Sequence, residues 1–156
     1  MLERMEECAR PLALEDIERL ETEIGVALPT IYKSFLVRFN GGIPVPDAFP
    51  IERMPKNPYG IIQVFFGIER NVHSSDLKWN YEVFRSDAPP NLFPIACTPS
   101  GDLVCISLWG DDVGSVVFWD YYDPYRGPTY ANVYRVARSF DEFIQGLFKS
   151  PESQGG

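Results

Sequence analysis

The stretch that decides the fold covers residues 28–42 and reads Leu28-Pro29-Thr30-Ile31-Tyr32-Lys33-Ser34-Phe35-Leu36-Val37-Arg38-Phe39-Asn40-Gly41-Gly42. Pro29 has the fixed φ that suits the first position of a helix. Ile31, Phe35 and Phe39 then follow at steps of four residues, which is the spacing of one helix face. The two closing glycines end the helix because glycine readily adopts the left-handed conformation found there. We therefore predict a helix from Pro29 to about Phe39.

A second helix is predicted just before this stretch. Ile17, Leu20 and Ile24 stand at i, i+3 and i+7, and Gly25 follows as a helix end. The side away from these apolar residues carries four glutamates, Glu15, Glu18, Glu21 and Glu23. The two helices make a hairpin over about residues 13–40 with an acidic outer face.

The segment after the hairpin is interrupted by proline. Five prolines between Ile43 and Tyr59 predict a tethered loop, since proline donates no backbone hydrogen bond to a sheet. Residues 61–66 are rich in β-branched and aromatic residues and predict a strand that ends at Gly67. Ser74 or Ser75 is expected to cap a third helix, whose apolar side carries Leu77, Tyr81 and Phe84.

The second half predicts hairpins and a last helix. Strands are expected over residues 92–97, 103–108, 116–119 and 133–137 because short apolar runs alternate with turn residues. Their nearly continuous apolar character indicates that both faces are covered, by helices on one side and the proline-rich loop on the other. Ser139 and Glu142 form a capping box, followed by an apolar stripe of Phe140, Phe143, Ile144, Leu147 and Phe148.

These elements predict an α+β fold, in which an N-terminal helical hairpin and a C-terminal helix pack on a largely antiparallel sheet. We expect residues 1–156 to form one domain, with a core over about 14–149 and a flexible tail over 150–156. No apolar run reaches the roughly 18 to 20 residues that a membrane helix needs. The acidic start does not resemble a secretory signal, so a cytoplasmic protein without membrane contact is expected.

Three cysteines and one histidine argue against a metal centre. Cys8, Cys97 and Cys105 are widely spaced, and a zinc site built on His73 would have to recruit carboxylates. Free thiols, with Cys97 and Cys105 in the core, fit a reducing compartment better. We expect no metal and no cofactor.

The charge is strongly negative and unevenly placed. Lys and Arg number 14 against 22 Asp and Glu, a net charge of −8, which argues against binding nucleic acid or an anionic membrane. Residues 91–130 hold a single base, Arg126, and five acids, Asp102, Asp111, Asp112, Asp120 and Asp123, interleaved with tryptophans and tyrosines.

Catalytic interpretations of these residues compete with ordinary ones. Glycine-rich phosphate loops are missing from the sequence. His73 stands beside two serines, as a hydrolase base or as a surface or capping residue. Asp111 and Asp112 could form a hairpin turn, contact a partner or bind a cation, and together with Asp120 and Asp123 they could act as the acid and base of sugar hydrolysis. Trp109 and Trp119 are expected in the core, whereas Tyr121, Tyr122 and Tyr125 could be buried or contact a partner.

The stretch over residues 28–42 resembles the signature of the SUKH superfamily, which includes bacterial immunity proteins and fungal Smi/Knr regulators of cell-wall synthesis. Further landmarks follow in the same order: Phe65 to Gly67, Pro94 to Ala96, Gly101-Asp102, Val116 to Asp120, and Val136 to Phe143. The resemblance covers about residues 14–149.

This resemblance implies a non-catalytic protein that binds and neutralises a toxin of a polymorphic or contact-dependent system. Such a toxin could be a nuclease, whose basic cleft an acidic antidote would fit. The alternatives are an intracellular regulatory or scaffold module and a carboxylate-dependent hydrolase. The resemblance identifies structural residues, namely Leu28, Pro29, Tyr32, Phe35, Asn40, Gly41, Gly42, Trp119, Ser139 and Phe140. Charge, loop position and aromatic content alone select the predicted partner-binding residues, Asp111, Asp112, Tyr122, Asp123 and Tyr125.

Overall fold

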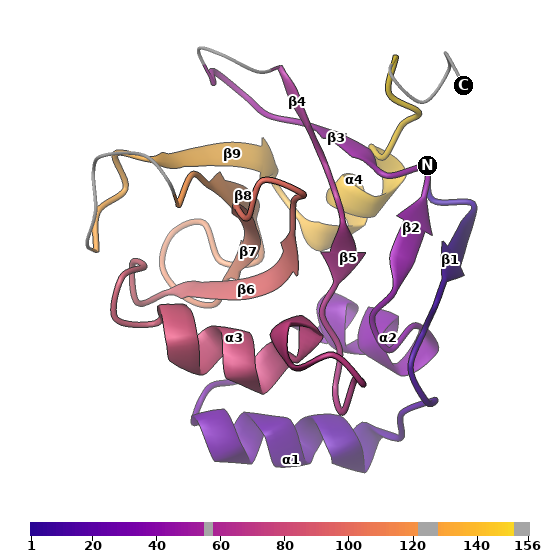
Figure 1. The fold of residues 1–156 in the computed structure, drawn as a ribbon. Helices are drawn as coiled ribbons and strands as arrows, with labels where there is room; N and C mark the ends of the chain where they lie inside the picture. The colour runs from indigo at the N-terminus through magenta and orange to yellow at the C-terminus, as the bar shows by residue number, and fades with distance from the viewer. Residues whose placement is uncertain (55–57, 122–127, 152–156) are drawn as a thin grey trace.

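The computed structural model describes residues 1–54, 58–121 and 128–151 and arranges them around an antiparallel sheet (Figure 1). In chain order its elements are β1 (Arg4–Glu6), α1 (Leu14–Ile24), α2 (Thr30–Arg38), β2 (Ile43–Val45), β3 (Ala48–Pro50), β4 (Tyr59–Ile61), β5 (Val64–Phe65), the 3-10 turn η1 (His73–Ser75), α3 (Leu77–Phe84), β6 (Leu92–Cys97), β7 (Leu103–Ser107), β8 (Val116–Trp119), β9 (Val133–Ala137) and α4 (Phe140–Gln145). The main sheet has five strands in the order β5-β6-β7-β8-β9, and two smaller sheets pair β1 with β2 and β3 with β4. The predicted α+β class is confirmed.

Both faces of the main sheet are covered, as the continuous apolar strands predict. Figure 1 shows α1 and α3 on one side of the sheet and the β3–β4 hairpin on the other. Phe93 of β6 packs its ring on Tyr81 of α3, and Phe118 of β8 packs on Phe49 of β3. Every residue of β7 and β8 is therefore buried.

The N-terminal helical hairpin is confirmed, but the buried face of α2 is rotated from the predicted stripe, of which Phe35 packs against the core and Ile31 does not. Gly25 ends α1 in the left-handed conformation, with φ of +73°. On α2 the buried residues are Tyr32 and Leu36, whereas Ile31 is 55% exposed. Residues spaced four apart are displaced by about 40° around the helix axis at each step, because a turn holds about 3.6 residues. The predicted stripe therefore shares only part of the face that meets the core. The Tyr32 ring decides this orientation by packing edge-on against Phe93 and Phe140.

The expectation that residues 43–59 form a loop is wrong in part. β2 pairs with the N-terminal strand β1, and β3 pairs with β4. Short strands at a sheet edge tolerate proline where its missing N–H is not needed. The hydrogen bonds come from residues between the prolines: Ala48 N donates to Phe148 O at 3.1 Å, and Ile51 N donates to Pro58 O at 3.0 Å.

Two other predicted elements change at their ends. The single strand expected over residues 61–66 is two strands, because β4 joins β3 while β5 joins the main sheet. Neither Ser74 nor Ser75 caps α3; both lie in η1, and the Asp76 carboxylate accepts the Trp79 N–H at 3.0 Å. Asp76 performs the capping predicted for a serine, since a carboxylate at this position accepts the same orphan N–H.

The C-terminal helix begins as predicted and ends early. Ser139 Oγ accepts the Glu142 N–H at 3.1 Å, and the Glu142 carboxylate reaches back to the Arg138 N–H at 2.6 Å. The helix stops at Gln145, and the chain beyond it extends so that Phe148 bridges to Ala48 of β3. Ser150, which the sequence places in the tail, is buried, and residues 152–156 lie outside the described part.

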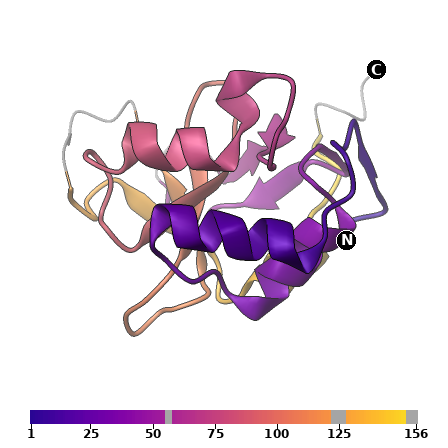
Figure 2. The ribbon, with the colours of Figure 1, turned by 90° about the horizontal axis from the view of Figure 1, so that it is seen from below.

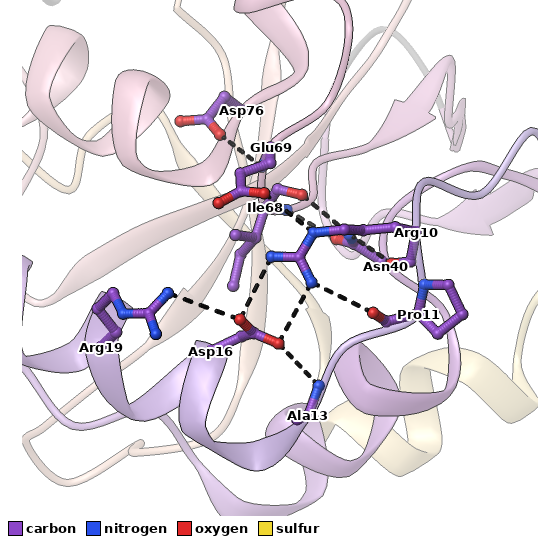
Figure 3. Close-up of polar contacts among 9 residues, drawn as sticks. All are labelled: Arg10, Pro11, Ala13, Asp16, Arg19, Asn40, Ile68, Glu69 and Asp76. Carbon is purple, nitrogen blue, oxygen red and sulfur yellow. Dashed lines mark hydrogen bonds and ion pairs between the residues drawn. The ribbon is translucent and has the colours of Figure 1, made fainter.

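A polar junction built on Asn40 joins the helical hairpin to the sheet (Figure 3). Its amide Nδ2 donates to the backbone oxygens of Arg10 and Ile68, both at 2.9 Å, and its Oδ1 accepts the Ile68 N–H at 2.7 Å. Beside it, the Arg10 guanidinium bonds to Asp16 of α1 and to Glu69. These hydrogen bonds hold the pKa of Asp16 below its usual range and raise that of Arg10.

Glycine is needed on both sides of this junction. A Cβ on Gly41 would stand 2.6 Å from Arg70 Nη1 and 2.8 Å from Phe65 O, and φ of Gly41 is +72°. A Cβ on Gly67 would lie 2.5 Å from the Asn40 Oδ1 atom. The glycines of this region thus allow three backbone segments to meet around one amide side chain.

Candidate functional site

The candidate site is the connection between β7 and β8, which extends away from the body of the protein (Figure 2). Asp111 and Asp112, both predicted to contact a partner, lie at its end and are exposed. The Asp112 carboxylate accepts hydrogen bonds from Ser107 Oγ at 3.2 Å and Ser115 Oγ at 3.4 Å. Ser107 is the last residue of β7, and Ser115 immediately precedes β8. The Asp112 carboxylate therefore links the two strands at the base of their connection. Asp111 carries its charge outward at the same turn.

Asn91 fixes this connection to two other parts of the chain. Its backbone oxygen accepts the Leu108 N–H at 2.8 Å, and its amide Nδ2 donates to Ser107 Oγ at 2.9 Å. Its Oδ1 atom accepts the hydroxyl of Tyr130, which precedes β9. Asn91 is buried, so three segments converge on one amide. Sequence reasoning missed Asn91 and Ser107, since neither residue stands in a recognisable motif.

Trp109 is exposed, which corrects the expectation that it lies in the core. It is 47% exposed, although it follows an apolar strand directly. β7 ends at Ser107 and the chain turns at Gly110, whose φ of +101° favours glycine, so Trp109 lies beyond the sheet. Val113 of the same connection is also exposed, and so is Tyr130, whose hydroxyl bonds to Asn91. We call Trp109, Asp111, Val113 and Tyr130 the tip surface.

Trp119 is 2% exposed, as predicted for a core residue. Its ring packs edge-on against Phe84 and Tyr121, with centroids 6.0 and 5.4 Å apart. Tyr121 is half-buried in this cluster. The predicted contact residues Tyr122, Asp123 and Tyr125 lie outside the described residues.

The acidic residues of this region lie in two groups. Asp112 precedes β8 and Asp120 follows it, and the four residues of this strand extend about 13 Å. Asp102 is near Asp120, because its carboxylate accepts the Tyr121 N–H at 3.1 Å. Paired carboxylates that hydrolyse sugars are separated by less than about 10 Å. The structure therefore does not bring Asp112 and Asp120 together as an acid and a base.

The remaining candidates for chemistry have structural surroundings. The His73 ring lies against Trp79, with centroids 5.7 Å apart. Cys105 is buried and Cys97 is half-buried, and burial raises the pKa of both thiols. Across the three described ranges, no three side chains of His, Cys, Asp or Glu gather as a metal site would require. Within the same ranges, no helix combines the length and the apolar character that crossing a membrane requires.

The residues of the 28–42 signature build the fold. Tyr32 and Phe35 pack on Phe140, and Asn40 holds the polar junction. Leu28 is buried, and its N–H donates to the Glu21 carboxylate of α1 at 2.7 Å. Pro29 immediately precedes α2, and its oxygen accepts the Lys33 N–H at 3.0 Å.

The structure thus defines an α+β domain with a fold-building N-terminal signature and an exposed, acidic and aromatic surface at one hairpin. The chain belongs to the SMI1/KNR4 family (SUKH-1), whose family model matches residues 11–146. This family includes immunity proteins that bind toxins, and its members are generally non-catalytic. The chain is also similar to the SPbeta prophage-derived uncharacterized protein YokK of Bacillus subtilis (strain 168), with 28% identity over 152 residues. That match covers 88% of this chain and 75% of the relative.

Proposed function

We propose that this protein is an immunity protein that binds a cognate toxin and neutralises it without catalysis. The observation that carries the proposal is family membership over residues 11–146, in a family that includes immunity proteins. The charge supports a toxin with a basic surface, such as the substrate cleft of a nuclease, because opposite charges accelerate association.

A long stretch of the sequence that includes the candidate site carries acids and no bases. Between Arg85 and Arg126 the sequence has no lysine or arginine, whereas it has Asp87, Asp102, Asp111, Asp112, Asp120 and Asp123. The acids on α1 are partly neutralised: Glu21 pairs with Lys33 at 3.6 Å, and Glu23 pairs with Lys78 at 3.5 Å. A basic partner would therefore be attracted to the two acidic groups at the ends of β8, one of which is the Asp111–Asp112 turn of the β7–β8 connection. Asp111 and Asp112, with Tyr122, Asp123 and Tyr125, remain the proposed contact residues.

The test is co-expression with the toxin domain encoded next to its gene. Cell survival and a complex that co-purifies are the expected results. Death without a complex would exclude that toxin, and failure with every neighbouring toxin domain would overturn the proposal. Weak binding to several partners, without protection, would indicate a regulatory or scaffold module of the Smi/Knr type.

Charge steering is tested with two triple variants of the same net charge. Asp111→Asn, Asp112→Asn and Asp123→Asn together should slow association at low salt and flatten its salt dependence. The matched control replaces the exposed glutamates Glu15, Glu18 and Glu52 by glutamine. Equal effects of the two variants would show that only net charge matters.

A further inference from the structure

We propose that Trp109 and Val113 form the apolar anchor of the partner-binding surface, and that Asp112, besides its proposed contact with the partner, acts as a positioning residue that holds this anchor in place. The partner that fits is a folded protein surface rich in lysine and arginine. This inference rests on the proposed function and assigns to the tip surface a role that charge alone does not predict.

Three large side chains of the tip surface are exposed. Trp109 is 47% exposed, Val113 57% and Tyr130 58%, although all three have apolar side chains or rings. The Tyr130 hydroxyl bonds to Asn91, and the Asn91 backbone also bonds to Leu108, the neighbour of Trp109. These exposed groups therefore belong to one corner of the molecule. Tryptophan and tyrosine are the residues that most often dominate the energy of a protein interface.

The β7–β8 connection is ordered by its own hydrogen bonds before any partner binds. Three backbone hydrogen bonds close the connection: Gly114 N donates to Ser107 O at 2.8 Å, Ser107 N to Ser115 O at 2.9 Å, and Ser115 N to Asp112 O at 3.0 Å. The Asp112 carboxylate adds the two serine hydroxyls described above. A surface that is already ordered loses little conformational entropy on binding. These five hydrogen bonds hold the connection in one conformation, so that Trp109 is presented in one position.

The exposed charge near the Trp109 anchor is negative. Asp111 is exposed beside Trp109, and the sequence holds no base from residue 86 to residue 125. An apolar anchor with an acidic rim fits a partner that places an aliphatic or aromatic pocket among cationic side chains. Arginine suits such a partner, because its guanidinium can stack on the Trp109 ring and pair with the Asp111 carboxylate. The charge also disfavours acidic partners, which gives the surface selectivity.

The anchor is tested by binding kinetics with the toxin domain encoded next to the gene. Trp109→Ala should weaken binding about 30-fold or more, mainly through faster dissociation, and leave the salt dependence unchanged. Val113→Ser should weaken it about fivefold. Val72→Ser is the matched control, since Val72 is 59% exposed and lies on the segment before α3. Thermal unfolding of each variant shows whether the fold is intact.

The positioning role of Asp112 has its own test. Ser115→Ala removes a hydrogen-bond partner of the Asp112 carboxylate without changing any charge. If Asp112 acts by holding the connection, Ser115→Ala and Asp112→Ala should both accelerate dissociation, whereas Asp111→Asn should mainly slow association at low salt. If Ser115→Ala binds like the natural chain while Asp112→Ala does not, Asp112 contacts the partner itself and the positioning role is wrong.

The outcomes separate the two proposals. Tight binding of a toxin that Trp109→Ala and Val113→Ser leave unchanged would overturn the anchor and leave the immunity function standing. Absence of binding and protection with every neighbouring toxin domain would overturn both. Loss of binding in Trp109→Ala, with Val72→Ser unchanged and both variants folded, supports the anchor.

Discussion

Replacing Asn40 by alanine should destabilise the protein more than any other single loss of a buried amide described above. The side chain is 2% exposed and makes three hydrogen bonds, to Arg10 and Ile68, across about thirty residues of sequence (Figure 3). Alanine removes all three bonds and leaves one N–H and two C=O groups without this partner. The same change leaves the N-terminal segment joined to the loop that follows Gly67 mainly through exposed contacts such as the Arg10–Glu69 pair.

The magnitude follows from these contacts. A hydrogen bond contributes about 1 kcal/mol net, and an orphaned buried group costs about 1 to 3 kcal/mol. Water can reach part of the junction, since the Arg10 and Glu69 side chains are exposed. The lower end of the range therefore applies, and three groups give about 3 kcal/mol. For a chain of 156 residues this corresponds to a fall in Tm of about 6 to 12 °C.

Asn132 is the matched control. It is also 2% exposed, and among the described residues its side chain has one hydrogen bond, from Nδ2 to Asp120 O at 2.9 Å. Asn132→Ala should therefore cost about 1 kcal/mol, a third of the Asn40→Ala effect. Urea unfolding followed by tryptophan fluorescence measures both, with an unchanged m-value as the sign that the same surface is exposed. Equal losses in the two variants would refute the assignment of Asn40 as the junction's main support.

Three further predictions concern buried or paired groups. Tyr32→Phe should be neutral or should stabilise the protein by about 1 kcal/mol, as measured by urea unfolding. The buried Tyr32 hydroxyl has no hydrogen-bond partner in the described part of the chain, and burial raises its pKa. A loss of stability above about 1 kcal/mol would reveal such a partner. The lowered pKa of Asp16 means that its stabilising effect is complete above the unfolded pKa of about 3.9 and is lost as the pH falls through the lower folded pKa. Asp16→Asn should therefore lower stability at pH 7 and reduce the dependence of Tm on pH below about pH 4, and unchanged curves would contradict this. In the folded protein a thiol reagent should modify Cys8 first and Cys97 slowly, while Cys105 reacts only in urea; prompt reaction of all three thiols would show that the core opens readily.

The elements that the sequence predicted well are those specified by neighbouring residues. Gly25 ends α1, and Ser139 begins α4, because a helix end depends on the conformation and hydrogen bonds of a few adjacent residues. The strands over residues 92–97 and 103–107 are continuous apolar runs bounded by turns, so their existence follows from local pattern.

The errors occur where distant segments decide the outcome. The proline-rich segment contains β2 because the N-terminal strand β1 pairs with it, and nothing near Pro44 indicates that partner. The Ser74 and Ser75 prediction is a local exception, because Asp76, one residue later, accepts the Trp79 N–H instead.

The candidate site shows the same division. Its acidic and aromatic composition, including Asp111 and Asp112, is plain in the sequence, and the signature of residues 28–42 identifies the family. The exposure of Trp109 and the convergence of Asn91, Ser107 and Tyr130 require the tertiary structure, because these residues lie up to 39 positions apart.

Sequence by itself therefore determined the class of fold, most helix ends, the family and the sign of the charge, all of which depend on local pattern or on composition. Only the tertiary structure decided which apolar side chains are buried and which are exposed. The physical reason is that burial depends on the segments that pack against a residue, and Trp109 and Trp119 end similar apolar runs yet differ in exposure from 47% to 2%.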